Sequence, residues 1–402
     1  MSWEYVALGE LYEVHNGLSK GGKFFGKGSP FLSFSTVFNK WFLPQELLDL
    51  VQSTDNEQQS YSILRGDVFI TRTSETMDEL GMSSVALKDY PHATYNGFTK
   101  RLRPINPERV LPEFIGYYLR TPVFRAGFTA FSTMTTRASL RNEDLLSMKV
   151  PVPDMQTQKH IASILSAYDD LVENNQKQIK LLEEAAQRLY KEWFVDLRFP
   201  GHETTPIVDG IPEGWERMVL SEVTSVLKRG ISPKYSDNGK YSVINQKCIR
   251  SSIMDISESR RQEKEYAPTL NLQDSDTVIC STGTGTLGRV GRVYGDYPNT
   301  TFDSHVTLVR AKENPNYIYH VVKSQQEYLM GMGRGSTNQQ ELYRDVIERL
   351  VVLCPSQDIL LKAERVLNAI HCKIKAVYLQ NNLLVESRDR LLPKLMSGEI
   401  EV

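Results

Sequence analysis

Two stretches of the chain carry apolar residues at alternating steps of four and three. The first stretch spans residues 161 to 193, and the second follows 202 residues further on. This spacing places one side chain per step on a single face of a helix, so each stretch predicts a long helix whose apolar seam needs a partner. The first seam consists of Ile161, Leu165, Tyr168, Val172, Asn175, Ile179, Leu182, Ala186, Leu189 and Trp193. The second consists of Ala363, Leu367, Ile370, Ile374, Val377, Asn381, Leu384, Arg388, Leu391 and Leu395.

Each seam contains one asparagine, and this decides how we expect the helices to pair. An antiparallel register centred on both seams sets Asn175 opposite Asn381, so that two buried amides satisfy each other. A parallel pair in equal register would leave each amide opposite an aliphatic residue. We therefore predict an antiparallel two-helix coiled coil whose register these asparagines fix. The same register sets Trp193 opposite Ala363, Leu165 opposite Leu391, and Arg388 beside Tyr168 as a stacking pair.

The segments before the two helices resemble each other. The first repeat begins with WEYVALGELYEV at residues 3 to 14, which returns 212 residues later as WERMVLSEVTSV. Strand-like GDVFITRT (66–73) has a counterpart in SDTVICST (275–282). Near the end of each repeat, LRNEDLLSMKVPVP (140–153) and LYRDVIERLVVLCP (342–355) predict a short helix and then a strand that a proline ends. The chain therefore reads as globule, helix, globule, helix.

We predict an α+β protein of two similar α/β globules, related by an approximate two-fold axis and joined by the two helices. The expected boundaries are 1–152 for the first globule, 153–198 for the central helix, 199–354 for the second globule and 355–402 for the C-terminal helix. Residues 199–214, rich in proline and glycine, are the expected linker. Two matched globules suit a DNA target with two half-sites, but also two copies of one protein partner, or a duplicated scaffold.

Composition narrows the class of protein only a little. The chain has 402 residues, 40% hydrophobic content and a net charge of −2, which argues mildly against nucleic-acid binding. Positive charge is concentrated, however: residues 97–149 carry nine Lys or Arg against four acids, and residues 228–250 carry six against one. Four scattered cysteines predict reduced thiols rather than a zinc site. With no apolar run long enough for a membrane span, we expect a cytoplasmic protein.

Three local motifs suggest other chemistry and fail on context. GTGTLG (283–288) fits a dinucleotide fingerprint, but the residues that follow favour a strand, so we expect a glycine turn there. NPNY (314–317) departs from the adenine-methyltransferase tetrapeptide at Asn316 and is expected to end a strand. The acid of PDMQTQK, Asp154, is expected to cap a helix N-terminus. The sequence has no metal-binding histidine spacing and no local nucleophile signature.

Six segments, in order, resemble the specificity subunit of type I restriction-modification enzymes, over essentially the full length. They are GDVFITRTSETMDELGMSS (66–84), YNGFTKRLRP (95–104), PDMQTQKHIASIL (153–165), AAQRLYKEWFVDLRFPG (185–201), IPEGWE (211–216) and RDRLLPKLMSGEIEV (388–402). The resemblance implies that each globule is a target-recognition domain for one half of a bipartite double-stranded DNA sequence. It implies that the chain is non-catalytic, and that the helices set the spacer between the halves and bind two methyltransferase subunits.

The resemblance also implies which cofactors the complex uses. S-adenosylmethionine is expected on the methyltransferase subunits, and ATP and magnesium on motor-nuclease subunits, with none in this chain. A modification-only system and a coiled-coil scaffold that binds no DNA remain as alternatives.

Polar residues on predicted loops are our candidates for DNA contact, because Arg, Lys, Asn, Gln and Ser reach phosphates and base edges. In the first globule they are Lys20, Arg72, Thr73, Asn96, Lys100, Arg101 and Arg137. In the second they are Lys228, Arg229, Lys234, Asn245, Lys247, Arg289, Ser304 and Gln339.

Overall fold

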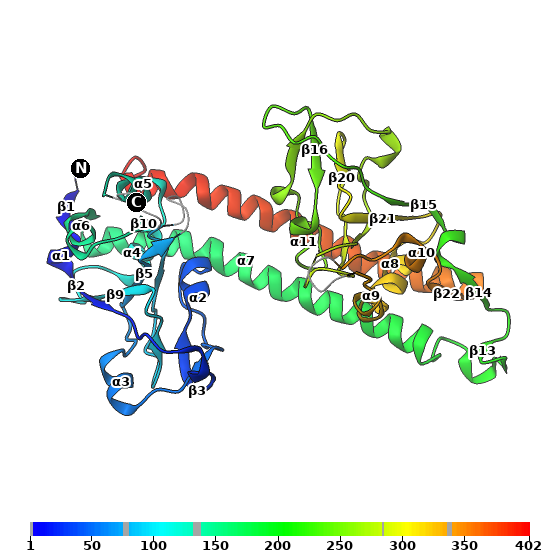
Figure 1. The fold of residues 1–402 in the computed structure, drawn as a ribbon, viewed down its shortest axis with the longest axis horizontal. Helices are drawn as coiled ribbons and strands as arrows, with labels where there is room; N and C mark the ends of the chain where they lie inside the picture. Colours follow the sequence, from blue (N-terminus) through cyan, green and yellow to red (C-terminus); the bar gives the residue numbers. More distant parts are fainter. Residues whose placement is uncertain (1–2, 75–79, 132–137, 284, 336–339) are drawn as a thin grey trace. The chain divides into compact units, whose positions relative to one another are not determined.

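A computed structural model describes the chain in two compact units (Figure 1). The described residues are 3–74, 80–131, 138–283, 285–335 and 340–402. Unit 1 comprises residues 1–174 and 380–402, and unit 2 comprises residues 175–379. Each unit therefore contains a segment of both long helices, α7 (Met155–Tyr190) and α11 (Gln357–Ser397).

Unit 1 contains eleven strands and six short helices within the described residues, besides its helix segments. The strands are β1 (Glu4–Ala7), β2 (Tyr12–Asn16), β3 (Phe25–Leu32), β4 (Leu50–Val51), β5 (Val68–Thr71), β6 (Thr73–Ser74), β7 (Ser83–Val85), β8 (Thr94–Tyr95), β9 (Thr99–Pro104), β10 (Ala138–Ser139) and β11 (Lys149–Val152). The helices are α1 (Leu8–Leu11), α2 (Phe34–Asn39), α3 (Asp55–Ser60), α4 (Pro112–Tyr118), α5 (Pro122–Phe131) and α6 (Asn142–Ser147).

Unit 2 has a similar order of elements, with eleven strands and three short α-helices within the described residues. Its strands are β12 (Ile207–Val208), β13 (Ile211–Pro212), β14 (Glu216–Val219), β15 (Thr224–Arg229), β16 (Tyr241–Ile244), β17 (Arg260–Gln262), β18 (Thr277–Cys280), β19 (Val290–Arg292), β20 (Thr300–Phe302), β21 (Val306–Ala311) and β22 (Val351–Cys354). Its helices are α8 (Pro315–Ser324), α9 (Gln326–Gly331) and α10 (Arg344–Glu348).

The sheets of the two units have matching strand orders. A four-stranded antiparallel sheet runs β2-β9-β5-β7 in unit 1 and β15-β21-β18-β19 in unit 2. A three-stranded sheet runs β4-β3-β8 and β17-β16-β20, and in both its last pair of strands is parallel. The pair β1-β11 corresponds to β14-β22. The duplication and the α+β class predicted from the sequence are confirmed.

A buried ion pair recurs at equivalent places in the two sheets. In unit 1 the Asp67 carboxylate lies 2.6 Å from the Arg103 guanidinium, and in unit 2 Asp276 lies 2.7 Å from Arg310. The aspartates are 0% and 1% exposed, and each also accepts a backbone N–H from the residue three positions earlier. Removing either arginine would leave a buried carboxylate without its counter-charge, so both sheets depend on this pair.

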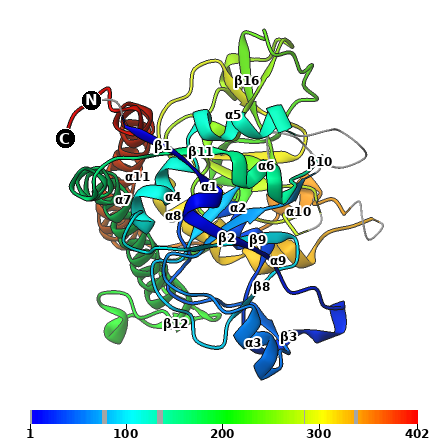
Figure 2. The same cartoon turned by 90° about the vertical axis from the view of Figure 1, so that its left-hand side faces the viewer.

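In unit 1, the first part of α7 packs against the last part of α11 (Figure 1 and Figure 2). The Asp154 carboxylate caps α7 as predicted, because it accepts the N–H groups of Gln156 and Thr157 at 2.9 and 3.0 Å. Further along, Asp169 pairs with Arg388, and Asn381 Nδ2 lies 3.5 Å from the Val172 carbonyl oxygen. Residue numbers therefore rise along one helix as they fall along the other, which confirms the antiparallel pairing in this unit.

In unit 2, the remaining parts of the two helices pack in the same sense. Trp193 and Ala363 belong to one core cluster, and Ile179 shares another with Ile374. Asn175 and Asn381 are both 8% exposed. Because these two asparagines belong to different units, their facing each other stays a prediction.

In unit 1, helix α4 meets the long helices through a charged contact, which we call the unit 1 joint. The Tyr117 hydroxyl donates to Asp169 Oδ2 at 2.6 Å, and Asp169 also pairs with Arg388. The Arg388 guanidinium lies 4.7 Å from the Trp41 ring centroid. Arg388 thus stacks on Trp41, so the predicted stacking on Tyr168 is wrong; the Trp41 indole, from the segment after α2, takes that place.

Unit 2 has a different contact at the equivalent place, the unit 2 joint. The Tyr294 hydroxyl lies 2.8 Å from His371 Nδ1, and the Nε2 atoms of His371 and His320 lie 3.0 Å apart. Next to this pair, Arg292 is only 1% exposed and donates to Asn316 Oδ1 at 2.6 Å.

The motif NPNY opens a helix, so the prediction that it ends a strand is wrong. Asn314 has a left-handed backbone (φ 53°) immediately before Pro315, the first residue of α8. This start directs Asn316 inward, where its Nδ2 donates to Glu364 of α11 at 2.6 Å.

Candidate nucleic-acid interface

Four of the predicted contact residues of unit 1 come together at one corner of its sheet. Arg72 and Thr73 follow β5, Asn96 lies in the turn between β8 and β9, and Lys100 lies at the start of β9. The backbone of Arg72 is fixed on both sides, because its N–H donates to the Phe98 carbonyl and its carbonyl accepts the N–H of Leu140. We call this cluster the unit 1 corner.

The unit 1 corner holds two cations without a carboxylate partner in the described part of the chain. The Lys100 ammonium is 5% exposed and donates to Asn142 Oδ1. Burial, and then the positive charge of Arg72, hold the pKa of Lys100 below its usual value. The Nε of Arg72 is buried and has no hydrogen-bond partner there. An anion such as a phosphate would relieve both the repulsion and the unsatisfied donor.

Two other predicted residues of unit 1 have partners within the fold. The Lys20 ammonium forms an ion pair with Glu57 at 2.7 Å and donates to the Gln52 carbonyl. Arg101 is 7% exposed and donates to the Ser62 carbonyl at 2.8 Å. These contacts tie the loops of unit 1 to its sheet. Arg137 lies outside the described residues.

The equivalent unit 2 corner is formed by Thr282, Ser304, His305, Arg229 and Glu341. In this corner the cation has a partner within the fold. Arg229 forms an ion pair with Glu341 and donates from Nε to the Ser304 carbonyl. The Thr282 hydroxyl lies 2.6 Å from His305 Nδ1. The two corners have the same backbone plan and different side-chain chemistry.

The remaining predicted residues of unit 2 are dispersed. Lys234 forms an exposed ion pair with Glu263 at 2.8 Å, and Asn245 accepts the N–H of Lys247 at 2.8 Å. Arg289 donates to the carbonyls of Ile249 and Gly285 at 3.1 and 2.9 Å. The Lys247 side chain is exposed. Gln339 lies outside the described residues.

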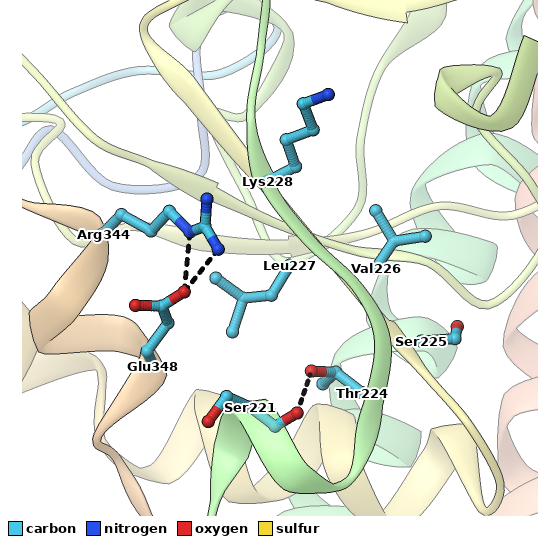
Figure 3. Close-up of a pocket in the computed structure, with 8 residues that line it drawn as sticks. All are labelled: Ser221, Thr224, Ser225, Val226, Leu227, Lys228, Arg344 and Glu348. Carbon is cyan, nitrogen blue, oxygen red and sulfur yellow. Dashed lines mark hydrogen bonds and ion pairs between the residues drawn. The ribbon is translucent and has the colours of Figure 1, made fainter. Parts of the chain in front are cut away.

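Lys228 stands beside a shallow groove along β15 (Figure 3). The groove is lined by Ser221, Thr224, Ser225, Val226, Leu227, Lys228, Arg344 and Glu348. Arg344 pairs with Glu348 at 2.6 Å, and the Thr224 hydroxyl donates to the Leu220 carbonyl at 3.0 Å. With these groups engaged internally, exposed Lys228 is the group of this groove best placed for a phosphate.

Within the glycine motif, residues 285–288 form a turn, as predicted. Gly283 and Gly288 have φ of 100° and 74°, values that favour glycine, and strand β19 begins at Val290. A dinucleotide site requires a helix at that point. Among the described residues no group of three or more His, Cys, Asp or Glu is arranged to hold a metal ion. None of their helices is both long and apolar enough to span a membrane.

The predicted set lacks Thr282, His305 and Glu341 of the unit 2 corner. It also lacks Phe98, whose carbonyl accepts the Arg72 N–H at the unit 1 corner. No motif marks them, and Phe is not a usual base-reading residue. The available signal was the repeat itself, since Phe98 and His305 each end the turn before an equivalent strand, β9 or β21.

The model of the type I restriction modification DNA specificity domain matches the chain twice, over residues 1–184 and 212–359. The chain belongs to this family. It is 28% identical over 334 residues to the MjaIX type I restriction enzyme specificity subunit of Methanocaldococcus jannaschii, covering 79% of this chain and 75% of that one. It is 23% identical over 373 residues to the HindI specificity subunit of Haemophilus influenzae, covering 73% and 79%.

A solved structure has the same fold. The S subunit of a type I restriction-modification system from M. genitalium aligns with a TM-score of 0.56 at 15% identity, covering 98% of this chain and 96% of that one.

Proposed function

We propose that this chain is the DNA sequence-specificity subunit of a type I restriction-modification complex, in which each unit reads one half of a bipartite target. The observation that carries the proposal is the duplicated specificity domain, with one strand order in both units. The unit 1 corner supports it, because Arg72 and Lys100 have no carboxylate partner among the described residues, and DNA phosphate would supply an anion there.

The helices set the spacer between the half-sites and bind two methyltransferase subunits. Large apolar side chains on α7 favour a protein partner, since Leu171 is 48% exposed and Leu181 is 65% exposed. In unit 2, Leu181 borders a surface groove with Glu184, Ala185, Arg188, Leu189 and Glu192.

The chain itself is non-catalytic and acts through its partners. The methyltransferase subunits bind S-adenosylmethionine, and motor-nuclease subunits use ATP and magnesium. Our support is family membership, together with corners whose side chains suit binding.

Methylated adenines mapped in a genome with and without the gene test the function directly. We expect a motif with two defined halves to lose methylation when the gene is deleted. An unchanged map, with no footprint from the chain and its methyltransferase partner, would contradict the proposal and favour a protein scaffold.

Arg72→Ala then tests the unit 1 corner in the same complex. Loss of one phosphate contact should weaken footprint protection at one half-site and reduce the slope of log affinity against log salt by about one. Lys88→Ala, an exposed lysine of unit 1, is the matched control and should change neither. Equal loss of protection at both half-sites would argue against two independent readers.

A further inference from the structure

The turns between β8 and β9 and between β20 and β21 have the same hydrogen bonds. In the first, Asn96 Oδ1 accepts the N–H of Phe98 at 2.7 Å. In the second, Asp303 Oδ1 accepts the N–H of His305 at 2.9 Å. A side-chain oxygen thus closes each turn onto the residue two positions later, and this residue is the tip of the turn.

The tip residues are also fixed to the neighbouring strand in the same way. The Phe98 carbonyl accepts the N–H of Arg72 at 3.0 Å, and the His305 carbonyl accepts the N–H of Ser281 at 2.8 Å. Each tip backbone therefore has its N–H and its carbonyl engaged.

A glycine packs under each turn: Gly17, which follows β2, and Gly230, which follows β15. A Cβ at Gly17 would lie 2.0 Å from the Asn96 carbonyl oxygen, and one at Gly230 would lie 2.2 Å from the Asp303 carbonyl oxygen. Only glycine permits this approach of two backbones, so the sheet supports both turns closely. The tips are rigid platforms rather than free loops.

The buried ion pair of the sheet is the same in both repeats, whereas the residue at the tip differs. The ion pairs Asp67–Arg103 and Asp276–Arg310 are the same in both units. At the tips, an apolar ring stands in unit 1 and an imidazole in unit 2. Phe98 is 54% exposed, and His305 is exposed with Nδ1 held by Thr282. A conserved support with a varied tip suits two readers of different sequences.

We propose that Phe98 and His305 are specificity-determining residues, each reading a base pair in the half-site of its own unit. The inference rests on the proposed function. The Phe98 ring offers an apolar surface for a thymine methyl group. When the Thr282 hydroxyl donates to Nδ1, His305 Nε2 carries the proton and donates to a purine N7, an acceptor in the major groove.

Binding of the chain with its methyltransferase partner to duplexes that differ from the target at single base pairs tests the proposal. Phe98→Ala should reduce discrimination about tenfold at one base pair of one half-site and leave the other half-site unchanged. His305→Ala should do the same in the opposite half-site. Tyr5→Ala, which removes a ring that is 53% exposed in unit 1, should leave discrimination intact.

The outcomes separate this inference from the function on which it rests. If the unaltered complex discriminates at no base pair, the proposed function fails. If it reads two half-sites and Phe98→Ala and His305→Ala keep full discrimination, the inference alone is overturned. A uniform loss of affinity for all duplexes would also overturn it, because it would make the tips general contacts. Unchanged thermal melting of each variant confirms that the fold is intact.

Discussion

The unit 1 joint and the unit 2 joint attach equivalent short helices, α4 and α8, to the long helices with different chemistry. Unit 1 uses a charged pair, Asp169 with Arg388, and adds the Tyr117 hydroxyl. Unit 2 uses two buried imidazoles, those of His320 and His371. Burial first, and then Arg292, lower the pKa of His320 to about 3 and that of His371 to about 2. The duplicated fold therefore tolerates ionic or neutral contacts at this position, but they respond differently to mutation and pH.

The largest effect should come from breaking the unit 2 joint at Asn316. Asn316 is 3% exposed, and Asn316→Ala removes the Oδ1 acceptor of buried Arg292 and the Nδ2 donor to Glu364. Within the described part of the chain, Arg292 keeps only the Pro315 carbonyl at 3.3 Å, and Glu364 keeps only the backbone N–H groups of residues 316 and 317. We expect a loss of about 3 kcal/mol in the free energy of unfolding, measured by urea denaturation. Asn382→Ala, at an exposed position of α11, is the control; an equal loss in both would contradict the role of the joint.

Acid should weaken the unit 2 joint more than the unit 1 joint. The pKa values of His320 and His371 in the folded chain lie below the unfolded value of about 6.5, so the unfolded state binds protons first as pH falls. Their contribution is fully present above about pH 6.5, and stability declines below it, by about 2–3 kcal/mol at pH 5.5. Glu183 opposes this trend, because burial raises its pKa in the folded state.

Urea unfolding at pH 7.5 and 5.5 measures the acid effect. The double variant His320→Gln, His371→Gln should remove most of the difference between the two pH values. A difference of the same size in the double variant would assign the acid sensitivity to other groups.

The smallest effect should come from the unit 1 joint. Arg388→Ala removes the partner of Asp169 and the contact with the Trp41 ring. The side chains of Arg388 and Asp169 are 14% and 29% exposed, so water screens part of the charge. We expect a loss of about 1–2 kcal/mol. Arg388→Lys should recover only part of it in the same urea titration, because an ammonium lacks the planar fork; full recovery would mean that charge alone matters.

The sequence was sufficient to predict elements whose cause is local or periodic. The seam predicted α7 and α11, Pro153 and Pro355 marked the ends of β11 and β22, and Asp154 marked the start of α7. The repeat predicted two similar globules, and the two units have matching strand orders. Each of these features depends on spacing along the chain, which a single sequence displays.

The site residues were harder to predict because a cation looks the same in sequence whatever it binds. Arg101 and Arg289 donate to backbone carbonyls of distant loops, which only the folded chain brings near them. Arg72 and Lys100 differ from them because neither has a carboxylate partner within the described residues, and Lys100 donates to the amide oxygen of Asn142. Phe98 was missed because its exposure, not its residue type, makes it a candidate.

The strand pairs β1-β11 and β14-β22 bring the start and end of each recognition fold together. Glu4 lies opposite Val152, and Glu216 lies opposite Cys354. The chain therefore enters and leaves each fold at neighbouring points, next to the start of α7 or α11. In evolutionary terms each fold is an exchangeable cassette: two crossovers in a gene, one on each side of it, replace a whole reader and leave the helices unchanged.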